Sequence, residues 1–170
     1  MDRMVMVSEY PERSYADIVA LLGEDPSELL QEATDLAAAQ IDQIVMHMHT
    51  PWAWFDHSQD VEIHTGPCRA GRLITEVPLT WSAQRRRLLP SVTGSLTIAP
   101  ISGRLCELKY VGEYSAPYGV FKNSDDAAVG RRVLEAAVRR FVGELCALLE
   151  AKTEAPVAED AKGPATGTGF

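Results

Sequence analysis

Residues 124–150 read SDDAAVGRRVLEAAVRRFVGELCALLE, and this stretch decides the fold. Ser124 is a good N-cap, because its hydroxyl can accept a hydrogen bond from a free amide of the first helical turn. Apolar side chains then recur at helical spacing along one broad side, while arginine and glutamate occupy the other. The pattern predicts a helix over Ser124–Glu150, about 39 Å long. An apolar face of this width needs a large partner.

Alternating segments upstream supply that partner, since apolar and polar residues in strict alternation are typical of half-buried strands. Strands are predicted at residues 3–9, 61–65, 72–81, 95–98 and 106–114. Pro78 has no amide hydrogen for a ladder, so it indicates an edge or a bulge. The turn residues Pro100-Ile101-Ser102-Gly103 indicate a reversal of the chain. Short turns between consecutive strands favour an antiparallel meander.

Two helices are predicted between the first strand and the meander. Tyr15–Leu22 follows the N-cap residue Ser14 and ends at Gly23, a residue typical of the position after a helix. The second helix begins at Asp25-Pro26 and keeps helical spacing through about Met48. His47 and His49 point about 160° apart on such a helix, so they are not expected to share a metal ion.

Composition excludes several classes of protein. The chain has 170 residues and a net charge of −8, which argues against a general nucleic-acid or anionic-membrane binder. Three widely separated cysteines without a CxxC pair argue against a disulfide framework or a zinc site. No segment approaches the roughly 20 apolar residues of a membrane span. The beginning of the chain does not resemble a signal peptide, so a cytoplasmic location is expected. No cofactor is expected either.

The domain organisation follows from where the apolar residues stop. Residues 1–150 are predicted to form a single domain. Residues 151–170 read AKTEAPVAEDAKGPATGTGF and are predicted to be a disordered tail, because they offer too little apolar surface to offset the entropy of ordering. A separate aromatic stretch holds Trp52, Trp54 and Phe55. Two interpretations stay open for it: a loop folded over the edge of the core, or a lid or interface patch.

Several short motifs carry a family resemblance: Val77-Pro78-Leu79-Thr80-Trp81, Leu89-Pro90, Gly94-Ser95-Leu96, Ala99-Pro100-Ile101, Gly112-Glu113-Tyr114, Ala116-Pro117-Tyr118-Gly119 and Asp125-Asp126. With the order of elements, they resemble the START-like helix-grip superfamily, also called SRPBCC, including some actinobacterial members of unknown role. The resemblance covers about residues 3–150. It implies an α+β fold in which an antiparallel sheet grips the long C-terminal helix. The full fold has more strands than the clear ones here, so either residues 83–91 add a strand or the sheet is smaller.

The resemblance also implies an apolar cavity between sheet and helix, which would bind or transfer an apolar or aromatic small molecule or a lipid. Its walls would be Leu79, Trp81, Leu96, Ile98, Leu108, Tyr110, Tyr114, Leu134, Val138 and Phe141. An alternative is a solidly packed structural or protein-interaction module, which includes a homodimer through residues 52–55. A cyclase- or hydratase-type enzyme is the third hypothesis and needs an acid or base inside the cavity. The candidate groups fall on the opposite strand faces: Glu62, His64, Glu76, Glu107 and Glu113.

Overall fold

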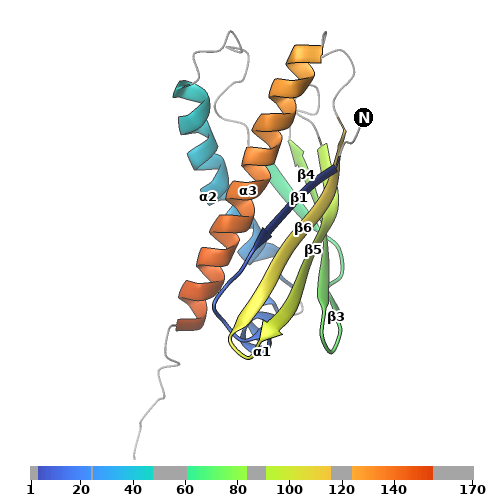
Figure 1. The fold of residues 1–170 in the computed structure, drawn as a ribbon, viewed down its shortest axis with the longest axis vertical. Coiled ribbons are helices and arrows are strands. Elements are labelled where there is room, and N and C mark those ends of the chain that lie inside the picture. Colours follow the sequence, from blue (N-terminus) through green and yellow to red (C-terminus); the bar gives the residue numbers. More distant parts are fainter. Residues whose placement is uncertain (1–3, 24, 48–60, 84–90, 116–123, 155–170) are drawn as a thin grey trace, which may run out of the picture.

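The computed structural model describes residues 4–23, 25–47, 61–83, 91–115 and 124–154. Its elements are β1 (Met4–Glu9), α1 (Tyr15–Leu22), α2 (Ser27–His47), β2 (Val61–Thr65), β3 (Arg69–Ala70), β4 (Thr75–Ala83), β5 (Ser91–Ser102), β6 (Leu105–Ser115) and α3 (Ser124–Glu154). One antiparallel sheet packs against the long C-terminal helix, and α1 and α2 follow the first strand (Figure 1). The predicted α+β fold is confirmed.

The sheet has the strand order β1-β6-β5-β4-β2, and the short β3 pairs with β4. Register brings residues far apart in sequence into rows across the strands. Ile63 lies beside Trp81, Trp81 beside Val92, and Val92 beside Tyr114. This row crosses the end of the sheet at which β4 and β6 stop. Because α3 follows β6 in the chain, the N-terminal half of the helix lies over the same end (Figure 1).

The two faces of the sheet differ in the way that the alternation predicts. In β1, Val5 and Val7 are buried while Met4 and Met6 are exposed, so this strand is covered on one side only. Side chains on the inner face pack against α1, α2 and α3 in a single apolar core. No helix in the described part of the chain is long and apolar enough to cross a membrane.

Several strand boundaries of the meander differ from the sequence prediction. β4 begins at Thr75 rather than at residue 72, because the Gly71 amide donates to the Ile74 carbonyl at 2.8 Å and closes a turn there. β5 runs from Ser91 to Ser102, longer than predicted at both ends. The predicted reversal at residues 100–103 is found slightly later, at Gly103-Arg104, since a register shift between Pro100 and Ser102 lets β5 continue past the proline.

Pro78 occupies a strand with neighbours on both sides, so of the two predicted positions, an edge or a bulge, the edge is wrong, and an irregularity of the ladder is found instead. It pairs with Ser95 of β5, and on the other side its carbonyl accepts from the Gly66 amide at 2.8 Å. Gly66 lies between β2 and β3, where the neighbouring ladder is interrupted. The missing amide hydrogen of proline therefore falls where the neighbouring ladder is interrupted.

Local capping explains where the first two helices begin and end. The Ser14 hydroxyl accepts from the Asp17 amide at 3.2 Å, and Gly23 takes a positive φ of 59° after Leu22. Glycine has no Cβ to oppose that conformation, so α1 ends there. The Asp25 carboxylate accepts from the Ser27 amide at 3.0 Å, which places it at the start of α2. Both predicted caps are confirmed.

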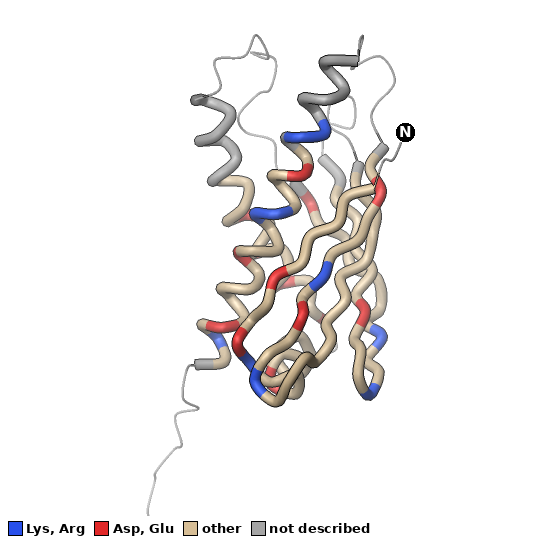
Figure 2. Tube along the Cα trace, in the orientation of Figure 1, with Lys and Arg blue, Asp and Glu red and all other residues tan. Residues whose placement is uncertain are grey.

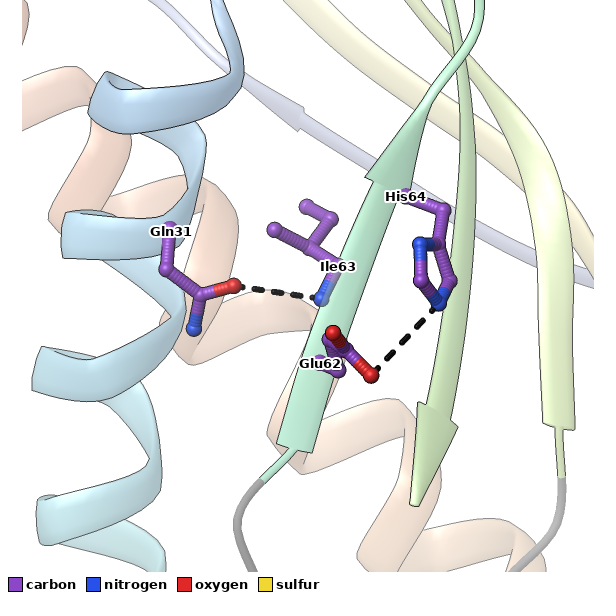
Figure 3. A network of polar contacts seen from close by, with 4 residues as sticks. All are labelled: Gln31, Glu62, Ile63 and His64. Carbon is purple, nitrogen blue, oxygen red and sulfur yellow. Dashed lines mark hydrogen bonds and ion pairs between the residues drawn. The ribbon is translucent and has the colours of Figure 1, made fainter. Parts of the chain in front are cut away.

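The edge of β2 is covered by α2. The Gln31 side-chain carbonyl accepts from the Ile63 amide at 3.2 Å, so a helix residue takes up an amide at the end of the sheet (Figure 3). An exposed edge invites pairing with another chain, and this hydrogen bond removes one of its free donors.

Helix α3 continues to Glu154, past the predicted end at Glu150. Arg13 joins this last turn to the loop after β1: its Nε donates to the Thr153 hydroxyl at 2.7 Å and an Nη donates to the Glu150 carbonyl at 2.9 Å. Residues 151–154 are therefore helical, and the rest of the predicted tail lies outside the described residues.

These contacts make the effect of truncation testable. A chain ending at Glu154 is expected to unfold at the same temperature as the full chain. One ending at Glu150 loses the Thr153 acceptor and is expected to melt lower by about 4 °C, roughly 1–2 kcal/mol. Thermal unfolding of both chains checks this. A drop of that size for the longer truncated chain would show that residues 155–170 dock on the domain.

Candidate functional site

The ten residues predicted to line a cavity all belong to the apolar core or pack against it, on the strand and helix faces that the alternation assigned to them. Eight of them are buried: Leu79, Trp81, Leu96, Ile98, Leu108, Tyr110, Val138 and Phe141. Tyr114 and Leu134 are half-buried and pack against that core. Their orientation follows the prediction, whereas their role as ligand contacts stays a prediction.

Three aromatic rings meet in the middle of this layer and come from three elements. The centroid of Trp81 in β4 lies 5.0 Å from that of Tyr110 in β6 at an interplanar angle of 51°. It lies 4.8 Å from the centroid of Phe141 in α3 at 82°, an edge-to-face contact. Such geometries are favoured between aromatic rings. At this point sheet and helix are joined by direct contact of side chains.

The ring of Tyr110 lies over two glycines that face one another across β5 and β6. Gly94 and Gly112 are register partners. A Cβ on Gly112 would lie 2.7 Å from Cζ of Tyr110, and one on Gly94 would lie 2.6 Å from its hydroxyl oxygen. Any residue with a Cβ at position 94 or 112 would occupy the space that the Tyr110 side chain fills. The alternation places Gly112 on the inner face of the sheet. A glycine inside a strand often marks a place where another group approaches the backbone closely, so the sequence contained a signal for this contact.

The hydroxyl of Tyr110 is a buried polar group without a partner. The side chain is 0% exposed, and its oxygen makes no hydrogen bond within the described part of the chain. Burial raises the pKa of this phenol well above its ordinary range. The large majority of buried side-chain polar atoms in proteins have a hydrogen-bond partner, so this oxygen needs an explanation. It extends over Gly112 and Gly94, toward the row that holds Trp81 and Tyr114.

Burial along α3 decreases toward that same end. Phe141, Leu145 and Leu149 are buried, whereas Leu134, nearer the N-terminus, is half-buried. Tyr114 at the end of β6 is half-buried too. Leu134 and Tyr114 are therefore the half-buried members of the predicted lining, and they lie next to a row in which Trp81 and Val92 are buried. Residues 52–55, which the sequence proposed as a lid or an interface, lie outside the described residues.

The candidate acid and base groups lie on the outer face of the sheet, as predicted. The side chains of His64 and Glu62 are more than half exposed, and Nε2 of His64 lies 3.7 Å from Oε2 of Glu62 (Figure 3). Glu107 accepts from the Ser8 hydroxyl at 3.1 Å. Glu76 and Glu113 share this outer face by register. Among the described residues, no three His, Cys, Asp or Glu side chains gather as a metal site would require.

A hollow lies outside the apolar core, between α3 and the end of β1. It is an open groove of about 620 Å³ with a charged lining: Glu9, Arg132, Glu135, Ala136, Arg139, Arg140, Gly143 and Glu144. Glu135 forms an ion pair with Arg131, whose Nε lies 2.7 Å from Oε1 of Glu135. Acidic and basic side chains alternate here, so this groove differs from the apolar cavity that the sequence analysis predicted.

No protein-family model matches the sequence, and no curated protein matches it. Among solved structures, a hypothetical protein from Helicobacter pylori aligns at TM-score 0.41 and 10% identity, over 84% of this chain and 88% of that one. A protein from Thermus thermophilus aligns at TM-score 0.39 and 10% identity, over 88% of this chain and 98% of that one. An aromatase/cyclase from Streptomyces aligns at TM-score 0.32 and 13% identity, over 89% of this chain and 93% of that one. TM-scores this low establish neither a family nor a function.

Proposed function

We propose that the protein binds an apolar or aromatic small molecule, or a lipid, between the inner face of the sheet and α3. The ligand enters at the end marked by Trp81, Tyr114 and Leu134. The observation that carries this proposal is the unpartnered hydroxyl of Tyr110, which is aimed toward that end from a fully buried ring. A ligand with one hydroxyl or carbonyl group would satisfy it.

The class of ligand follows from the side chains around that oxygen. Leu79, Trp81 and Val92 are apolar, and the rings of Trp81 and Phe141 offer flat surfaces. Pockets that are mostly apolar and hold a few polar groups bind small molecules by burying their bodies and orienting them through those polar groups. A flat hydrocarbon body with one polar substituent fits this lining. Three free thiols agree with a reducing, cytoplasmic setting for the same proposal.

The second candidate function is a structural or interaction module, and one observation favours it. Trp81, Tyr110 and Phe141 already contact one another where the ligand body would lie. A homodimer through the exposed Met4 and Met6 belongs to this candidate. Catalysis of the cyclase or hydratase type has less support, because the candidate acids and bases in the described residues face outward.

The matched test replaces Tyr110 with phenylalanine, which removes the oxygen and keeps the ring. Native protein is expected to prefer 2-naphthol over naphthalene, and Tyr110→Phe is expected to reduce that preference by about fivefold, the value of one neutral hydrogen bond. The free energy of unfolding without ligand is expected to stay equal or to rise, since an unsatisfied buried hydroxyl is lost. Equilibrium dialysis with both probes measures the preference.

Tyr15→Phe is the control, because the Tyr15 hydroxyl already has partners. It donates to the Gly71 carbonyl at 3.1 Å and lies 2.8 Å from the Thr75 hydroxyl. This variant is expected to lose stability and to keep the preference for naphthol. Absence of binding of either probe to native protein, together with no co-purified molecule in a native mass spectrum, would leave the packed module as the better account.

A further inference from the structure

Two turns at the end of the sheet opposite Tyr114 expose large aliphatic side chains. Leu73 is 68% exposed and Ile74 54% in the turn between β3 and β4. Ile101, close to the turn between β5 and β6, is 54% exposed. β4 and β5 are neighbours, with Thr75 beside Ile98, so the two turns lie at one end of adjacent strands, beside α1 (Figure 1). We call residues 72–74 and 101–104 the tip.

The tip is basic as well as apolar. Arg72 stands beside Leu73, and Arg104 follows Ile101 in the second turn; both are exposed. Figure 2 shows basic residues in both turns at the lower end of the sheet. Neither guanidinium makes a hydrogen bond or an ion pair with any residue that the structure describes. Arg69 lies nearby but faces Glu76 in register, so its charge is partly compensated.

We propose that the tip docks on an anionic lipid bilayer, with Leu73, Ile74 and Ile101 in the headgroup boundary and Arg72 and Arg104 on lipid phosphates. Aliphatic side chains flanked by arginine are the combination that binds membrane surfaces, since each supplies part of the affinity. Two tight turns present too little area for a stable protein partner, which buries about 800 Å² on each side. A bilayer needs only shallow insertion.

The net charge of −8 does not oppose this docking. Charges further away than the Debye length, about 8 Å at physiological salt, are largely screened, so the field at the tip is set by its own residues and their immediate neighbours, among which Arg69 faces Glu76. The acidity of the whole chain argues against a broad basic surface, which the tip does not need. Attachment through three aliphatic side chains is weak and reversible. The inference is independent of the proposed ligand site, which lies at the other end of the sheet.

Sedimentation of the full chain with vesicles tests the proposal. Native protein is expected to sediment with vesicles of phosphatidylcholine and phosphatidylserine and to remain in solution with phosphatidylcholine alone. Arg72→Gln and Arg104→Gln are each expected to weaken binding about fivefold, the fold-change that corresponds to one arginine near an anionic surface. High salt screens the contribution of the arginines, so the vesicle binding that remains there depends on the apolar side chains. The double variant Leu73→Ser, Ile74→Ser is expected to abolish that remaining binding.

Met4→Ser and Arg132→Gln are the matched controls, since they remove an exposed apolar and an exposed basic side chain at other places. Both are expected to bind vesicles like native protein. Failure of native protein to bind anionic vesicles overturns the proposal, as does equal binding to both kinds of vesicle. The proposal is also overturned if the two control variants lose vesicle binding to the same extent as the tip variants. Circular dichroism verifies that each variant is folded, and unchanged naphthol binding keeps this result separate from the proposed function.

Discussion

Replacing Phe141 with alanine is expected to lower the free energy of unfolding by about 3–5 kcal/mol. Phe141 is 3% exposed, and its ring meets that of Trp81 edge to face. Truncation removes the buried ring and leaves a void between α3 and β4, because neighbours anchored in a sheet and a long helix relax only in part. Urea unfolding followed by circular dichroism measures the loss.

Phe141→Trp and Leu36→Ala complete the experiment. Overpacking a filled core typically lowers stability by about 1–3 kcal/mol, so Phe141→Trp is expected to be destabilised as well. Leu36 is exposed on α2, and its truncation is expected to change stability by less than about 0.5 kcal/mol. A small loss for Phe141→Ala, with Phe141→Trp unchanged, would show that the ring borders empty space. That outcome would extend the proposed ligand site as far as the ring of Phe141, whereas the expected outcome confines the site to the Tyr110 hydroxyl and the end of the sheet beyond it.

Gly94→Ala is expected to lower the free energy of unfolding by about 3 kcal/mol. Its Cβ would lie 2.5 Å from the Cα of Gly112 and would also meet the Val111 carbonyl oxygen, both of them backbone atoms of the paired strand. A backbone held in a ladder between β1 and β5 cannot move aside without losing its hydrogen bonds. Thermal and urea unfolding of the variant measure the effect.

Gly112→Ala is expected to be milder than Gly94→Ala, because its Cβ meets the ring of Tyr110 and a side chain yields more easily than a backbone. Gly103→Ala is the control: no atom lies within 4 Å of the position that its Cβ would take. A change within about 0.5 kcal/mol is expected there. Equal stability of Gly94→Ala and Gly103→Ala would contradict the close approach of β5, β6 and the Tyr110 ring.

The sequence by itself determined the order of the three helices and of five strands, with the faces that most of them bury, whereas the short β3 was not predicted. Period-two alternation in β4 and β6 placed Leu79, Trp81 and Tyr110 on the inner face, and helical spacing placed Phe141 on the buried side of α3. These patterns are reliable because each is a local consequence of backbone geometry: strand side chains alternate, and helix side chains repeat every 3.6 residues. The caps Ser14 and Asp25 are local in the same way.

Only the tertiary structure decided which residues meet across elements. The pairing of Gly94 with Gly112 under the ring of Tyr110 depends on the register of β5 and β6 and on side-chain direction. The alternation predicted a strand from residue 72 onward, whereas a turn closed by Gly71 and Ile74 leaves Leu73 exposed at the tip. Strand ends depend on ladder hydrogen bonds between distant residues, and a sequence pattern carries no direct record of those bonds.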